Sequence, residues 1–306
     1  MLCIRPQRLL LPAVLLLAAG TSQAQTIDDG LMMPHKQLCT GFIYTHDGWD
    51  QYWEGPLKRA NGNIGTITTQ SVSWMGTYGV TDRLNVIAMV PWVHTGASAG
   101  TLSGMHGFQD LSVAVKWTAL DTDLTRRGTL RAFFVASGAV PLTDYTPDFQ
   151  PLSIGLASKR ASGRVSLSFQ AKAGWFAEGT GAYTWRDKVK LDRPYYYTNG
   201  QLFFSDEVAM PDVIEYTFRA GYSKHGLYVP ISFSQQITTG GGDIRRQDMP
   251  FVSNRMDASR VDALAMYYLQ TPKNLAVRLG ATYAVSGRNV GQSTTLLAGL
   301  LYTVKF

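Results

Sequence analysis

Residues able to do nucleophilic or acid–base chemistry gather around one segment of the sequence. His94 and His106 flank this segment, Ser98 and Ser103 lie within it, and Asp110 follows shortly after. A serine activated by a histidine that a carboxylate orients is the arrangement that attacks esters and amides. Histidines next to serines are also common in polar loops, and the His-x-Ser-Asn-Gly passage of membrane-embedded lipases does not occur. The sequence therefore favours a protein that is not an enzyme, with a lipid-acting hydrolase as an alternative.

Other polar clusters are weaker still. His46, Asp47 and Asp50 have the side chains that a metal would use, but a solvated loop explains them equally well. We therefore expect no metal and no other cofactor. The net charge is +6, yet the basic pairs at 58–59, 126–127, 159–160 and 245–246 are scattered rather than arranged in a stripe, which argues against nucleic acid.

The elements that would position these residues are long strands. Charged residues make up only 16% of the 306-residue chain, although the apolar fraction of 45% is ordinary. Beyond Val72, apolar and small polar residues alternate with a period of two, as they do from Val165 to Trp175. These segments reach about 10–13 residues, and a strand tilted across a bilayer needs ~9–11, twice the length of a usual strand. The pattern predicts an all-β fold, a transmembrane antiparallel up-and-down β-barrel, rather than a soluble sandwich.

Aromatic residues near the segment ends agree with two interfacial girdles, and short turns alternate with long loops, as in outer-membrane barrels. We expect twelve strands, an even number that places both termini in the periplasm; a further pair within 177–210 would make fourteen. The predicted strands are 37–46, 64–78, 84–94, 107–119, 128–140, 151–160, 163–176, 211–224, 226–238, 258–270, 274–285 and 292–306.

Both ends of the chain carry targeting signals. Residues 1–24 have a basic start, an apolar stretch and the small-x-small site Ser22-Gln23-Ala24, which together predict a signal peptide ahead of a single barrel domain at 25–306. The last strand ends in Phe306, and a terminal aromatic preceded by alternating apolar residues resembles the signal read by the barrel-insertion machinery of Gram-negative bacteria. Removal of the signal peptide leaves Cys39 as the remaining cysteine, so no internal disulfide is expected.

The strand register assigns one set of charged residues to the lumen, with basic side chains in excess. This favours an anion-selective pore or a ligand site for phenolate or carboxylate groups; a plugged interior with paired charges is the alternative. The predicted lumen charges are Asp110, Lys116, Arg131, Arg164, Lys172, Glu215, Arg219, Arg260, Asp262, Arg278 and Lys305.

Apolar side chains also face inward on this register, which fits either a narrow path for a hydrophobic solute or the filling of a small interior. They are Met75, Met89, Met266, Phe133, Leu297 and Leu301. Aromatic residues crowd the predicted long loop, where Trp185, Tyr195, Tyr196 and Tyr197 could stack on an aromatic compound. The segment 28–33 could plug the barrel mouth or lie free in the periplasm.

Two adjacent passages resemble a known family. YGVTDRLNVIAMVPWV, from Tyr78 to Val93, resembles the Y-G-[LV]-T-D-R-L-x-[LV] hairpin and proline-containing strand of the outer-membrane family named for the meta-pathway of phenol degradation. GFQDLSVAVKW, from Gly107 to Trp117, is similar to that family's G-x-x-D-L-x-[LV]-x-x-K-[YW] strand. The motifs describe a barrel hairpin and no chemistry. The resemblance implies passage of small, often aromatic or apolar compounds.

The sequence thus predicts a channel of the Gram-negative outer membrane for passive passage of a small solute. The resemblance favours a hydrophobic or aromatic compound. A lipid-acting hydrolase and a closed structural or adhesive barrel are the alternatives. The expected partners are outer-membrane lipid and lipopolysaccharide, the insertion machinery and the solute.

Overall fold

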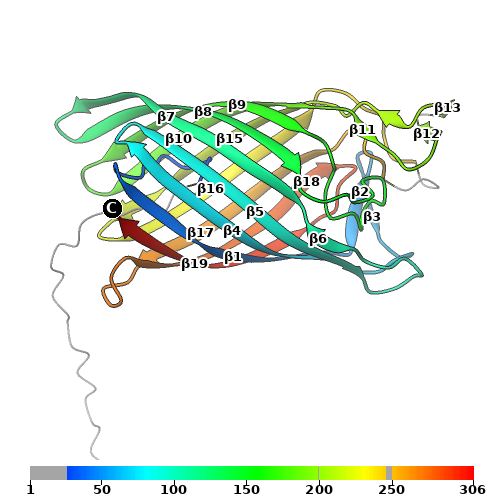
Figure 1. Cartoon of the computed structure of the whole chain (residues 1–306), viewed down its shortest axis with the longest axis horizontal. Coiled ribbons are helices and arrows are strands. Elements are labelled where there is room, and N and C mark those ends of the chain that lie inside the picture. Colours follow the sequence, from blue (N-terminus) through cyan, green and yellow to red (C-terminus); the bar gives the residue numbers. More distant parts are fainter. Residues whose placement is uncertain (1–25, 199, 246–249) are drawn as a thin grey trace, which may run out of the picture.

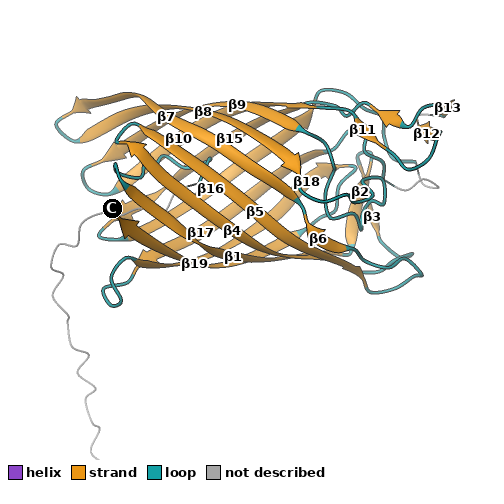
Figure 2. Cartoon of the chain, in the orientation of Figure 1, coloured by secondary structure: helices purple, strands orange, loops and turns teal. Residues whose placement is uncertain are grey.

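A computed structural model describes residues 26–198, 200–245 and 250–306, and the predicted signal peptide lies outside these residues. Twelve long strands among the described residues form one antiparallel sheet that closes on itself (Figures 1 and 2). The first strand of the barrel pairs with the last one and also with the second, so closure leaves no free edge between them. The described residues include no helix long and apolar enough to cross a membrane. The predicted twelve-stranded barrel is confirmed.

The barrel strands follow one another in chain order around the wall. They are β1 (Gln37–Trp49), β4 (Ile67–Thr81), β5 (Leu84–Ala97), β7 (Asp110–Thr125), β8 (Gly128–Pro141), β9 (Arg160–Ala171), β10 (Trp175–Arg186), β15 (Val213–Lys224), β16 (Leu227–Thr238), β17 (Asp257–Tyr268), β18 (Leu275–Arg288) and β19 (Thr294–Lys305). The C-terminus lies at the end where the connections are short, at the left of Figure 1, and we call this the short-turn end. The opposite end is the long-loop end.

Short strands in the long loops build a cap over the long-loop end (Figure 1). Six of the short strands form three small two-stranded sheets that are separate from the barrel sheet, whereas β6 pairs with β5. The short strands are β2 (Gln51–Glu54), β3 (Leu57–Ala60), β6 (His106–Phe108), β11 (Val189–Lys190), β12 (Tyr196–Thr198), β13 (Gln201–Phe203) and β14 (Glu207–Val208).

Alternation along each strand separates an outer apolar face from the interior, as the sequence predicts. On β9, Val165 and Leu167 are exposed on the outside, while Ser166 and Ser168 are buried inside. On β19, Leu300 is exposed and Leu301 is buried. Exposed apolar side chains around a closed wall are what a lipid environment requires, because lipid offers no partners for a polar side chain.

Two predicted strand boundaries are wrong. Residues 151–159 form no strand, although Leu152 and Ile154 alternate with other residues, and Arg160 is already the first residue of β9. Both are buried inside a loop that folds inward, and Ser153 between them is buried as well, so the alternation of residue types here does not reflect the two faces of a strand. The predicted strand 163–176 merges the end of β9, the tight turn 172–174 and the start of β10.

The strand β10 itself lies in a segment that the sequence assigns to a long loop. Its outward positions include Gly179 and Gly181, so the row of large outward residues is interrupted in the middle of the strand. The paired strand β15 supplies the missing cover, because Phe218 lies opposite Gly179 and Tyr216 opposite Gly181, with ring atoms 3.9 and 4.0 Å from the position of a glycine Cβ. Cross-strand aromatic cover is invisible in the sequence of either strand alone.

Candidate functional site in the barrel lumen

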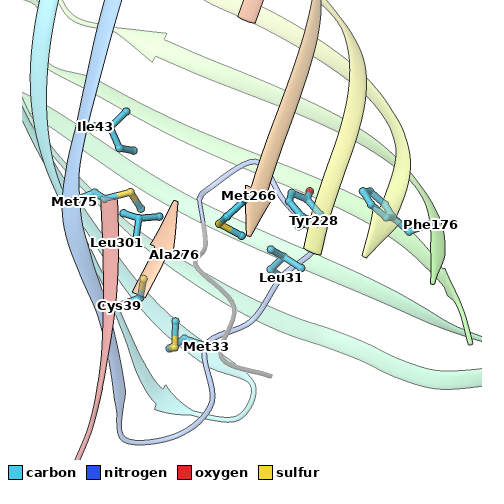
Figure 3. Close-up of a cluster of buried hydrophobic side chains, with 10 residues drawn as sticks. All are labelled: Leu31, Met33, Cys39, Ile43, Met75, Phe176, Tyr228, Met266, Ala276 and Leu301. Atoms are coloured by element: carbon cyan, nitrogen blue, oxygen red, sulfur yellow. The ribbon is translucent and has the colours of Figure 1, made fainter. Parts of the chain in front are cut away.

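The chain before β1 runs inside the barrel. Leu31 and Met33 belong to the largest group of buried apolar side chains, where they lie against residues of several barrel strands (Figure 3). Ile27 packs on a second group formed by Ile87, Ala114 and Val135. Of the two positions considered for residues 28–33, the structure therefore shows the one inside the barrel. We call residues 26–36 the lumen segment.

A buried ion pair joins the lumen segment to β7. The Lys116 Nζ atom lies 3.1 Å from the Asp29 Oδ1 atom, and the two side chains are 1% and 7% exposed. Lys116 also donates to the Thr26 carbonyl at 3.2 Å and to the Asp29 carbonyl. Its ammonium group lies 5.3 Å from the centre of the Phe133 ring. A lysine so deeply buried requires these partners, because an unpaired ammonium in the interior is costly.

Two arginines on strands further along the wall also hold the lumen segment. Arg164 on β9 pairs with Asp28 and lies 3.7 Å from a Glu215 oxygen. Arg219 on β15 donates to the Asp28 carbonyl and pairs with Glu178 at 3.1 Å. The segment is thus held from three barrel strands by charge-assisted hydrogen bonds, which are about twice as strong as neutral ones.

Backbone turns of the short-turn end receive the lumen segment where it joins β1. Lys36 donates its amide to the Gly79 carbonyl at 2.9 Å, and the His35 amide donates to Asp82 at 3.0 Å. A Cβ atom at Gly79 would lie 2.0 Å from the Pro34 carbonyl oxygen, so this close approach requires glycine. The hairpin motif that begins at Tyr78 therefore also positions the lumen segment, a role that its sequence alone does not reveal.

At the long-loop end, the loop 142–159 folds into the mouth. Tyr145 donates its hydroxyl to Asp110 at 2.7 Å, and Arg160 donates to the other Asp110 oxygen at 2.7 Å. The Ala157 amide donates to the Tyr145 oxygen at 2.9 Å. Burial, and then the hydrogen bond to Asp110, raises the pKa of Tyr145 far above its ordinary value, so the tyrosine is a neutral donor. This network anchors the loop to the barrel wall.

Two cavities lie around the lumen segment and share Thr26, Asp28, Arg278 and Leu297 in their walls. The smaller, of about 280 Å³, is mostly polar, with Tyr228, Asp262 and Arg278 among its lining residues. The larger, of about 480 Å³, has an apolar wall formed by Ile43, Met75, Ile87, Met89 and Leu297, with hydroxyl groups and arginines beside it.

The structure places the predicted lumen charges as follows. Arg131 lies 3.2 Å from Asp121, and Asp262 accepts hydrogen bonds from Thr282 and Ser232. Arg260 forms no hydrogen bond or ion pair with the described residues, and Lys305 is exposed at the end of β19. The other predicted lumen charges on barrel strands are Asp110, Lys116, Arg164, Glu215, Arg219 and Arg278.

Lys172 does not face the lumen. It is exposed in the turn between β9 and β10, where the Gly174 amide closes the turn on the Ala171 carbonyl at 2.9 Å. The predicted strand continues past Ala171 and so places Lys172 on the inner face. In the structure the strand ends at Ala171, and Gly174 in the following turn has a φ of +107°. A residue in a turn no longer follows the period of the strand.

The aromatic residues of the predicted long loop do not converge on one site. Trp185 is an outward residue of β10, and Tyr195 and Tyr197 are exposed on the cap. Tyr196 packs inside the cap, its ring stacked 5.2 Å from the Phe203 ring. The four residues therefore form no common stacking site in this structure.

The histidines and the carboxylate of the predicted cluster lie in different environments. His94 and His106 lie directly opposite each other on β5 and β6, and both side chains are exposed. Asp110 is buried and engaged with Tyr145 and Arg160. Among the described residues, no three or more His, Cys, Asp and Glu side chains are arranged to hold a metal ion.

Sequence reasoning missed Glu178, Tyr228 and Arg160 as interior residues. Glu178 lies on β10, which the sequence assigns to a loop, so no strand period indicates that it faces inward. Tyr228 lies at one of the inward positions of β16, so the alternation along this strand is sufficient to predict that it faces the lumen. Arg160 is the first residue of β9, but the predicted strand 151–160 ends at this position, so the sequence does not place it on the inner face.

Comparison with known proteins adds a fold relationship. The sequence matches no protein-family model, and it matches no curated protein. Among solved structures, the COG4313 outer membrane channel from Pseudomonas putida F1 is 14% identical, with a TM-score of 0.68 over 91% of this chain and 100% of that chain. At this identity the likeness shows a shared fold.

Weaker matches are also barrels. The NanC porin is 11% identical with a TM-score of 0.44, covering 85% of this chain and 98% of that chain. The translocator domain of the autotransporter NalP from Neisseria meningitidis is 9% identical with a TM-score of 0.45, covering 92% of this chain and 90% of that chain.

Proposed function

We propose that this protein is an outer-membrane channel through which a small hydrophobic or aromatic solute crosses passively. The observation that carries the proposal is the larger lumen cavity, of about 480 Å³, with an apolar wall inside a closed barrel. A general pore for hydrophilic solutes has a polar interior, whereas a wall containing Met75, Met89 and Leu297 favours an apolar solute. The shared fold with the P. putida channel supports a channel over other barrel functions.

The same proposal assigns the two ends. The long-loop end faces the outside and the short-turn end faces the periplasm, as in outer-membrane barrels with short periplasmic turns. Outer-membrane lipid and lipopolysaccharide then surround the apolar outer face, and the insertion machinery binds the C-terminal strand ending at Phe306. A signal peptide at 1–24 would direct export before insertion.

Uptake tests the proposal directly. A strain lacking this protein is supplied with radiolabelled phenol or toluene, alongside the same strain carrying the gene on a plasmid, and early accumulation is measured. Faster accumulation with the gene supports the channel. Equal uptake across a panel of aromatic and aliphatic compounds would overturn the proposed solute class. Liposomes holding purified protein provide the matching test without other cellular proteins.

The hydrolase alternative has no geometric support. The two exposed histidines on β5 and β6 lie outside, and the buried carboxylate of Asp110 is already bonded to Tyr145 and Arg160. We expect no release of acyl groups from p-nitrophenyl esters or phospholipids by refolded protein. Turnover that is lost in a His94→Ala variant would reverse this assignment.

A further inference from the structure

Arg278 differs from the basic residues that hold the lumen segment. Lys116, Arg164 and Arg219 each face a carboxylate. Arg278 forms no ion pair or hydrogen bond with the described residues, and its Nε atom is shielded from solvent. Polar groups in protein interiors are nearly always paired. The position therefore presents a guanidinium whose hydrogen-bonding capacity is not used by the protein.

The nearby carboxylates of the lumen segment are engaged elsewhere. Asp28 pairs with Arg164. Asp29 pairs with Lys116 and also accepts hydrogen bonds from the Thr26 amide at 2.6 Å and the Leu31 amide at 3.2 Å. The segment that fills the lumen thus leaves Arg278 available to another anion.

A second donor lies on the same cavity wall. Tyr228 on β16 and Arg278 on β18 are linked by one cross-strand row through Met266 on β17, and all three line the smaller cavity. The Tyr228 hydroxyl is also shielded from solvent and has no hydrogen-bond partner among the described residues. A carboxylate accepts hydrogen bonds on both oxygens, so an arginine and a tyrosine on the wall of one cavity match its needs.

Arg278 also lines the larger cavity, where Ile43, Met75 and Leu297 form part of the apolar wall. A cation at the junction of a polar and an apolar cavity suits a solute with an anionic head and an apolar body. A phenol would be neutral at pH 7, because phenolic groups have a pKa of about 10, whereas a carboxylic acid would be ionised.

We propose that Arg278 and Tyr228 bind the carboxylate of an amphipathic acid, such as an aromatic or short-chain carboxylic acid, whose apolar body lies in the larger cavity. This inference rests on the proposed channel function and names the class of solute. Arg278 provides the charge-assisted hydrogen bonds, and Tyr228 adds a neutral one.

The test compares an anion with its neutral counterpart. Binding of 4-fluorobenzoate and 4-fluorobenzyl alcohol to the full-length protein in zwitterionic lipid nanodiscs is followed by fluorine NMR. We expect the wild-type protein to prefer the anion by about tenfold or more, as a hydrogen bond to a charged group predicts. Arg278→Met is expected to bring the two affinities within about twofold while alcohol binding persists, and Tyr228→Phe to reduce the preference partially.

Arg260→Met is the matched control, because Arg260 is an inward arginine that forms no hydrogen bond or ion pair with the described residues and lines neither cavity. It should keep the preference. Equal binding of both compounds to the wild-type protein would overturn the proposal, and so would an unchanged preference in Arg278→Met. If that variant does not fold, as judged by its heat-dependent shift on electrophoresis, Arg278→Gln takes its place.

Flux measurements separate this inference from the channel proposal. Binding through Arg278 without transfer of 4-fluorobenzoate into liposomes would overturn the channel and leave the binding site. Transfer of apolar compounds without a binding preference for the anion would overturn the site and leave the channel.

Discussion

Removing the Asp29 carboxylate should release the lumen segment. In an Asp29→Ala variant, the buried Lys116 ammonium loses the carboxylate 3.1 Å away, and the Thr26 and Leu31 amides lose their acceptor. Breaking a buried ion pair by deleting one partner costs about 3–5 kcal/mol. Since each 1.4 kcal/mol is a factor of about ten, the equilibrium between seated and released segment shifts by more than about a hundredfold. The barrel strands keep their own hydrogen bonds, so the wall should remain folded.

Single-channel recording in planar bilayers measures the consequence. The wild-type protein should show a low conductance because the segment occupies the lumen, and Asp29→Ala should spend most of its time in a larger conductance state. A double variant, Asp29→Leu with Lys116→Met, should return toward the low state, because replacing both members of a buried pair by apolar residues is often neutral or stabilising.

Two results would refute this reasoning. Wild-type conductance in a folded Asp29→Ala protein would mean that the pair does not hold the segment. A double variant as open as the single variant would mean that the loss of packing, rather than the unpaired ammonium, opens the lumen.

Three further predictions concern other contacts. A Gly30→Ala substitution should also raise conductance, since the added Cβ would lie 2.4 Å from a carboxylate oxygen of β10. Tyr145→Phe leaves an Asp110 oxygen without its buried donor, at a cost of about 1–3 kcal/mol, and should speed proteolysis of the loop 142–159. Hydrogen bonds from Arg288 hold the pKa of Asp243 below its ordinary value of 3.8, so this contact should persist as pH falls to that value and be lost only below it, as followed by proteolysis of the cap at graded pH.

Each of these has a matched control. Gly62→Ala adds a methyl group where no atom lies within 4 Å, and it should leave conductance unchanged. Tyr195→Phe removes the hydroxyl of an exposed cap tyrosine and should not alter proteolysis of the loop. Asp243→Asn should abolish the acid-dependent step; the same step in that variant would assign it to another group.

The sequence by itself determined the class of fold and most of the wall. Alternation over long segments is enough to separate outward from inward residues, because successive side chains of a strand point to opposite faces. It placed Lys116 and Arg278 on the inner face without any coordinates. It failed at β10, where glycines replace large apolar residues on the outside, and at Leu152 and Ile154, where a loop imitates a strand.

Only the tertiary structure decided which interior groups meet. The period of a strand states which side a residue faces, but the partners inside a barrel come from strands and segments far apart in the chain. Asp29 pairs with Lys116, which is 87 positions away in the sequence, and Asp28 accepts a hydrogen bond from Arg219, which is 191 positions away. Arg278 has the same type and orientation as its paired neighbours, yet the path of the lumen segment leaves it without a carboxylate. Charge on the inner face is therefore a property of the sequence, whereas its neutralisation is a property of the closed barrel.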